Sequence, residues 1–156
     1  MKLSLSNGIF RKLGIKENFD AVKALEFENI EFNMKSIRKE HDTDVYREQK
    51  ALAESGLKCL THHSAVLHVK DPIEVHQAVY YGKISLECAR ALKAPIMTVH
   101  SNVSKRLSSE ARKKCISEIF GEIVPFAERF GIKLALENLS YTLRGLAKMW
   151  NNLKKS

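Results

Sequence analysis

Short apolar segments alternate with helix-like stretches along most of this sequence of 156 residues. Five segments rich in Ile, Leu, Val and Phe begin about 27, 29, 38 and 37 residues apart. Each interval has room for one helix and two loops, since a strand-helix-strand unit takes about 30 residues or more. The alternation is typical of a parallel α/β fold. The predicted strands span Lys2–Ser6, Asn29–Asn33, Lys58–His62, Ile96–His100 and Lys133–Glu137.

Helix boundaries are marked by local chemistry. Asp71 can cap free backbone N–H groups, Pro72 suits the first turn and Glu74 can complete a capping box, which predicts a helix from there to about Leu92.

Two further helices are predicted on either side of that one. The first runs from about Asp44 to Ser55 and ends at Gly56, and the second begins near Ser108 and ends at Gly131. Pro125 is expected to kink or break the second helix. That helix has an apolar stripe at three-to-four-residue spacing, made of Ile116, Ile119, Phe120, Ile123, Phe126 and Ala127.

The passage from helix to strand has a repeated sequence. A helix-Gly-x-Lys-strand string, or a close equivalent, occurs at residues 55–58, 92–95 and 130–133, which indicates one supersecondary unit used several times. A doubly wound open sheet and a (β/α)8 barrel both fit such repeats. A dinucleotide-binding fold is disfavoured, because residues 6–10 read Ser-Asn-Gly-Ile-Phe where such a fold needs Gly-x-Gly-x-x-Gly.

Composition indicates a soluble globular domain. The chain is 44% hydrophobic and 28% charged, and it has no apolar run near the ~20 residues of a membrane span. Residues 1–8 become polar too soon for the apolar region of a secretory leader, so we expect none. We therefore expect a cytoplasmic protein without a membrane partner. Three cysteines at wide spacing, with no Cys-x-x-Cys, are interpreted as small buried hydrophobes: Cys59, Cys88 and Cys115.

The formal net charge of +8 gives weak support for a nucleic-acid partner. Residues 141–156 contain four basic side chains and no acidic one, so they carry +4, half of the excess. The other 140 residues are only mildly basic.

Polar residues follow every predicted strand at its carboxyl end, where parallel-sheet and barrel enzymes place their chemistry. Adjacent parallel strands lie about 4.8 Å apart, so His63, His100 and Glu137, one repeat apart from each other, are expected to meet at one rim. Two imidazoles and a carboxylate suit a divalent cation. The polar strand ends are Ser6-Asn7, Glu31 and Asn33, His62-His63, His100-Ser101-Asn102 and Glu137-Asn138.

Each of these residues also has a plainer explanation. A single histidine is more often a surface or core residue than a ligand, and Glu137 could form an ion pair with Lys58 or Lys133. Asparagine after a strand can form a turn as readily as it can bind a polyol. The residues predicted to contact substrate are Asn7, His62, Asn102 and Asn138, whereas His41, His68 and His76 are assigned no role.

Three strand ends together resemble the xylose isomerase-like barrel superfamily, which contains sugar phosphate isomerases/epimerases and endonuclease IV-type DNA repair enzymes. They read Leu-Thr-His-His at 60–63, Met-Thr-Val-His-Ser at 97–101 and Leu-Ala-Leu-Glu-Asn-Leu at 134–139. The resemblance implies that Glu137 is a metal ligand that also helps to move a proton next to a carbonyl. It implies that His63 and His100 are ligands in the endonuclease branch and neighbours of substrate or metal in the isomerase branch.

The resemblance makes a partial (β/α)8 TIM barrel the predicted fold, with about five parallel strands and intervening helices in residues 1–140. It implies a divalent cofactor (Zn, Mn, Mg or Co) and a sugar or sugar phosphate substrate. The isomerase/epimerase branch is preferred because His100 is followed by Ser-Asn rather than the Pro-Gly of the endonucleases. The alternatives are an abasic-site endonuclease and a non-catalytic remnant.

Family members have eight strands in roughly 250 residues, whereas five are predicted here. We therefore expect an N-terminal fragment that lacks full activity alone and that self-associates through open barrel edges. Residues 141–156 form a basic tail unlike the family, and reading their back-translated codons in another frame permits a Gly-rich loop followed by an acidic helix. This indicates a frameshift near Thr142.

Overall fold

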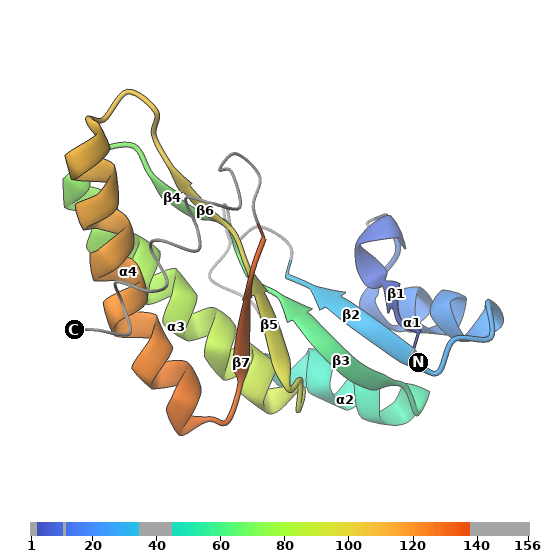
Figure 1. Ribbon diagram of the computed structural model, residues 1–156. Helices are drawn as coiled ribbons and strands as arrows, with labels where there is room; N and C mark the ends of the chain where they lie inside the picture. Colours follow the sequence, from blue (N-terminus) through green and yellow to red (C-terminus); the bar gives the residue numbers. More distant parts are fainter. Residues whose placement is uncertain (1–2, 11, 35–44, 138–156) are drawn as a thin grey trace.

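The structure is a computed structural model that describes residues 3–10, 12–34 and 45–137. The basic tail, the predicted frameshift and Asn138 lie outside the described residues. Helices and strands alternate as the sequence predicts (Figure 1). The elements are β1 (Leu5–Ser6), η1 (Asn7–Phe10), α1 (Ile15–Ala24), β2 (Asn29–Asn33), α2 (Val45–Ser55), β3 (Lys58–His63), β4 (Leu67–Val69), η2 (Pro72–Glu74), α3 (Val75–Ala91), β5 (Ile96–Val99), β6 (Ser101–Val103), α4 (Ser109–Arg129) and β7 (Lys133–Leu136).

Five parallel strands form the main sheet, in the order β1-β2-β3-β5-β7. This confirms the predicted α/β class and the five predicted strands. Sequential strands are neighbours in space, with one crossover helix between successive pairs, as in a barrel wall. The order never reverses, so it differs from that of a doubly wound sheet.

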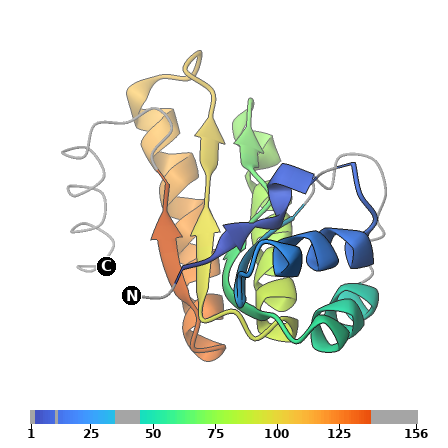
Figure 2. The same ribbon diagram turned by 90° about the vertical axis from the view of Figure 1, so that its right-hand side faces the viewer.

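A second, two-stranded parallel sheet was not predicted. β4 and β6 continue the chain beyond β3 and β5 and pair with each other (Figure 2). The backbone N–H of Leu67 donates to the carbonyl of His100, which joins the start of β4 to the end of β5. Three-residue strands are too short to show a periodic sequence pattern.

The helices α2, α3 and α4 lie along one side of the main sheet (Figure 1). Capping agrees with the sequence: Asp71 accepts a hydrogen bond from the backbone of Ile73, Glu74 completes the capping box, and Ser108 caps α4. α4 continues through Pro125 as one helix, so the predicted alternative of a break is wrong.

The core between helices and sheet includes Ile30, Phe32, Leu86, Ala89, Met97, Val99, Ile119, Phe120 and Ile123. The three cysteines are free and buried, as predicted.

Helices end in this fold by a left-handed turn. Gly56, Lys93 and Gly131, at equivalent places of the repeated string, have φ of 70°, 55° and 66°. After α3, the N–H of Ala94 donates to the carbonyl of Ala89 and that of Lys93 to the carbonyl of Arg90, which is the double hydrogen bond of a Schellman cap. Lys93 has a Cβ where the other two positions have glycine, so its turn is strained.

We predict that Lys93→Gly stabilises the protein by up to about 1 kcal/mol, because glycine adopts positive φ without steric cost while its extra freedom in the unfolded chain offsets part of the gain. Lys93→Ala is the matched control, since it removes the same charge and keeps a Cβ. Urea unfolding of both variants tests the interpretation, and equal stabilities would contradict it.

No helix in the described ranges is long and apolar enough to cross a membrane. Within those ranges β1 and β7 are the edges of the main sheet, and each pairs with one strand. Near β1 the exposed side chains include Leu3 and Ile9, at 62% and 63%. Parallel edges with apolar neighbours favour association between chains.

We predict that the chain self-associates through these edges at tens of micromolar. Sedimentation velocity is expected to show species above the monomer mass, and Ala135→Lys, which adds a charge to edge strand β7, is expected to shift the distribution toward monomer. A wild-type monomer with a cooperative thermal transition over this concentration range would overturn the prediction.

Candidate metal centre

A bulge in β3 decides which histidine reaches the site. Ile30 pairs with Cys59, but the next residue, Glu31, pairs with Thr61, so one extra residue is inserted in β3. Because side chains alternate across a strand, the insertion reverses the faces of all later residues. His62 therefore faces the helices and His63 faces the other side.

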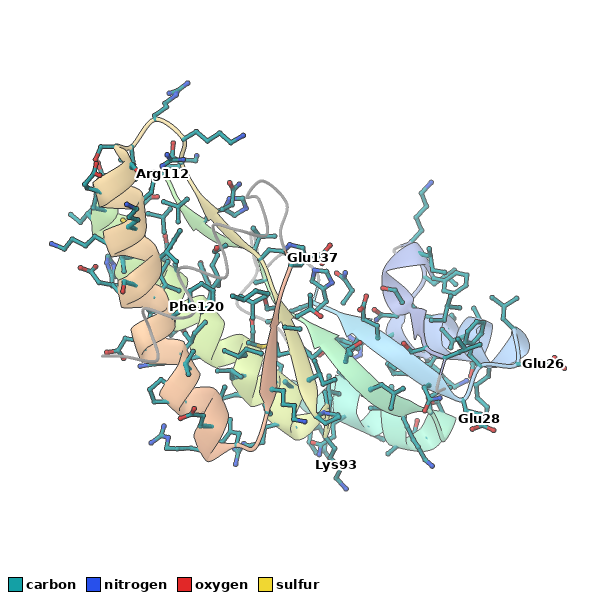
Figure 3. All side chains as sticks on the ribbon, in the orientation of Figure 1. Glu26, Glu28, Lys93, Arg112, Phe120 and Glu137 are labelled. Atoms are coloured by element: carbon teal, nitrogen blue, oxygen red, sulfur yellow. The ribbon has the colours of Figure 1, made fainter. Side chains whose placement is uncertain are left out.

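Three polar side chains converge at the carboxyl end of the sheet. His63 is paired with Thr98 of β5, and the N–H of Glu137 donates to the carbonyl of Val99 at 3.1 Å, so His100 lies between the ends of β3 and β7. Figure 3 shows Glu137 at this end, at the tip of β7. The predicted convergence of His63, His100 and Glu137 at one end is present in the structure.

The side chains of His63, His100 and Glu137 lie close to one another. Nε2 of His100 lies 3.0 Å from Oε2 of Glu137 and faces Nε2 of His63, and the two imidazole rings stack with centroids 4.4 Å apart. One ligand atom from each residue lies within 4.8 Å of the others. We refer to these three residues as the His-His-Glu cluster.

Burial differs strongly within the cluster. The side chain of His100 is 6% exposed and that of Glu137 is 48% exposed. Burial lowers the pKa of His100, and His63 acts in the same direction, whereas Glu137 and Glu31 oppose the shift. Lowering the pKa favours the neutral imidazole, which is the form that binds a metal.

The donor set fits a divalent cation. Two imidazole nitrogens and a carboxylate oxygen are ligands of Zn²⁺ and similar ions, and three protein ligands leave positions for substrate or water. In the described part of the chain, the basic side chain that pairs with Glu137 is His100, rather than Lys58 or Lys133. A bound cation would balance a carboxylate that has only this neutral imidazole opposite it.

The remaining predicted substrate residues lie in different surroundings. His62 is completely buried against Phe32, with ring centroids 5.8 Å apart, so it does not join the cluster. The side-chain oxygen of Asn7 accepts a hydrogen bond from the backbone N–H of Asn33 at 2.6 Å, and Asn7 is buried. Asn102 is exposed on β6, where its Nδ2 lies 3.2 Å from Nδ1 of His68.

Two further polar residues, Glu31 beside the cluster and His68 on β4, were assigned no role from the sequence. Glu31 follows the buried Ile30 in β2, and its Oε1 lies 3.7 Å from Nδ1 of His63. Its position at a polar strand end was the available signal. His68 faces Asn102 because β4 and β6 pair in register, and nothing in the local sequence indicates that pairing.

Fold and cluster together define a class: a parallel (β/α) barrel-type chain with a His-His-Glu cluster at the carboxyl ends of its strands, whose donor atoms suit a divalent cation. Residues 19–156 match the family described as xylose isomerase-like TIM barrel. The chain belongs to this family. No curated protein sequence matches it.

Several solved structures have a similar fold. The 3-keto-D-glucoside 4-epimerase from E. coli is 16% identical with a TM-score of 0.77, over 100% of this chain and 65% of that one. The IOLI protein with a zinc atom is 16% identical with a TM-score of 0.73, over 99% and 59%. An AP endonuclease, family 2, from Brucella melitensis is 15% identical with a TM-score of 0.73, over 97% and 64%. The chain thus spans about three fifths of the length of these structures.

We predict that His62 makes the fold sensitive to acid. Burial lowers its pKa from 6.5 to about 4, with a smaller effect from His63, and neither ring nitrogen has a hydrogen-bond partner among the described residues. Below pH 6.5 His62 is protonated in the unfolded chain, whereas in the folded chain it stays neutral until the pH falls to about 4. The contribution of His62 to the free energy of unfolding is therefore fully present above pH 6.5. At pH 5 the free energy of unfolding is lower by about 2 kcal/mol because of this group alone.

The variant His62→Leu is expected to lose less stability than the wild type between pH 7 and pH 5, by about that amount, and to be no less stable at pH 7, because it removes two buried polar atoms without partners. His76→Gln, at an exposed site on α3, serves as the control. Urea unfolding at both pH values measures the difference. Identical pH dependence in wild type and His62→Leu would contradict the interpretation.

Proposed function

We propose that this chain carries part of the active site of a metal-dependent isomerase or epimerase that acts on a sugar or sugar phosphate. The observation that carries the proposal is the His-His-Glu cluster at the carboxyl ends of adjacent parallel strands. We propose His63, His100 and Glu137 as ligands of one divalent cation, whether Zn²⁺, Mn²⁺, Mg²⁺ or Co²⁺.

A divalent cation in this position would polarise the substrate carbonyl. The catalytic group proposed in this chain is Glu137, whose carboxylate is half exposed and so open to substrate. It would accept the proton from the carbon beside the carbonyl, while the C–H electron pair forms a C=C bond and the carbonyl oxygen takes the negative charge. An isomerisation is completed when the adjacent hydroxyl proton moves to the former carbonyl oxygen, so that a new C=O bond forms, and Glu137 returns its proton to the former carbonyl carbon. An epimerisation is completed when another acid protonates the original carbon on its opposite face.

Substrate hydroxyl groups would be held by amide side chains near the cluster. Asn102 is exposed, and it lies two residues beyond His100, on a strand that continues past β5. We propose Asn102 as a polyol contact, and Asn138, outside the described residues, on the basis of the sequence alone. Similar structures support a sugar substrate, since they include a 3-keto-D-glucoside 4-epimerase and a D-psicose 3-epimerase with D-tagatose.

We predict that Glu137→Gln weakens metal binding. Calorimetric titration of the full chain with Zn²⁺ and with Mn²⁺ is expected to give a dissociation constant at least about 10-fold higher for the variant, because a charged ligand becomes a neutral amide. Glu128→Gln removes an exposed carboxylate from the last turn of α4 and is the matched control. Equal affinities in wild type and Glu137→Gln would remove Glu137 from any metal site.

The same variants separate chemistry from binding. With saturating Mn²⁺ in D₂O, NMR is expected to show exchange of the proton beside the carbonyl of D-tagatose or D-fructose 6-phosphate, slowed by 100-fold or more in Glu137→Gln. Metal binding without exchange of either probe would favour a non-catalytic remnant. Cleavage of abasic DNA, without exchange, would favour the endonuclease alternative.

A further inference from the structure

Glu31 lies near Nδ1 of His63, whereas His100 lies near Nε2 of the same ring. The two residues come from adjacent strands, since Glu31 pairs with Thr61 and the side chains of Thr61 and His63 share one face of β3. Oε1 of Glu31 is 3.7 Å from Nδ1 of His63, and Oε2 is 3.4 Å from Oγ1 of Thr61. Side-chain exposures of 29% for Glu31 and 19% for His63 show that both are partly shielded from solvent.

The imidazole of His63 therefore has different neighbours at its two nitrogens. Nδ1 is directed toward a carboxylate, and Nε2 faces Nε2 of His100. A neutral imidazole has one N–H donor and one acceptor, and an ionised carboxylate can only accept. The proton is thus favoured at Nδ1, which leaves the Nε2 lone pair directed toward the cluster.

We propose that Glu31 is a positioning residue that fixes the tautomer and ring orientation of His63, so that Nε2 is a ready ligand. This inference rests on the proposed metal site and adds a residue to it. Carboxylates that accept from the second nitrogen of a ligating histidine raise its basicity, and their loss lowers metal affinity by about 10- to 100-fold. The 3.7 Å separation is within ion-pair distance and longer than a hydrogen bond, so the proposal is that the two groups approach each other when His63 binds a metal.

A purely structural role for Glu31 is less consistent with its contacts. Among the residues that the structure describes, His63 is the basic side chain within ion-pair distance of Glu31, and its other contact is the neutral hydroxyl of Thr61. Half-buried carboxylates are costly without a donor or cation. Glu31 lies in the middle of β2, two residues before its carboxyl end, whereas Glu28 precedes that strand at its amino end (Figure 3).

The test compares Glu31→Gln with the control Glu28→Gln, which changes an exposed carboxylate just before the same strand. Nitrogen-15 NMR of the metal-free chain reports the His63 tautomer directly. The wild type and Glu28→Gln are expected to show the Nδ1–H form, and Glu31→Gln a shift toward Nε2–H, because an amide can donate to Nδ1. An Nε2–H tautomer in the wild type, or no change in Glu31→Gln, would overturn the inference.

Cobalt titration supplies the second measurement. Glu31→Gln is expected to raise the Co²⁺ dissociation constant by about 10- to 100-fold, and Glu31→Asp, which keeps the charge, to recover part of the affinity. Recovery by Asp would not occur if Glu31 only filled space, and unchanged affinity in Glu31→Gln would overturn the inference. If the wild type binds no Co²⁺, the proposed function fails, and the tautomer measurement still decides the role of Glu31.

Discussion

The parallel register of three adjacent strands is the constraint on which the site depends. β3, β5 and β7 run in the same direction with their carboxyl ends level, so His63, His100 and Glu137 meet although they are 37 residues apart from one to the next. Each strand is held in place by backbone hydrogen bonds to its neighbour and by a helix packed behind it. The spacing of the three side chains in the cluster is therefore set by the roughly 4.8 Å separation of strands rather than by any local loop.

The cluster combines groups of unequal exposure, and this combination suits a cation. His100 is nearly buried and its pKa is lowered by burial, so it presents a neutral nitrogen. Glu137 is half exposed and supplies the negative charge on the open side of the cluster. A carboxylate on the solvent side and the buried imidazole of His100 on the protein side would leave a cation held here accessible to a substrate, as in a catalytic rather than a closed structural metal site.

The sequence was sufficient for features with local or periodic signals. The strand positions and the convergence of the three polar side chains follow from apolar periodicity and repeat length, and the caps at Asp71 and Ser108 follow from local capping chemistry. The sequence was insufficient for features that depend on hydrogen bonds between strands, such as which face of the sheet a side chain points to. The bulge in β3 depends on pairing with β2, so alternation along β3 alone could not show whether His62 or His63 faces the rim. The sheet of β4 and β6 likewise exists only because β3 and β5 are already adjacent.

The bulge that directs His63 to the cluster also places the polar side chain of His62 in the core, where it lowers stability. Inserting one residue between Cys59 and Thr61 directs His63 to the cluster, and it necessarily directs His62 toward the helices. There the imidazole is stacked on Phe32, and neither nitrogen has a partner among the described residues. An apolar residue would suit that position better on stability grounds alone. A polar side chain is thus retained in the core directly beside the proposed ligand, at the place where the strand departs from regular alternation.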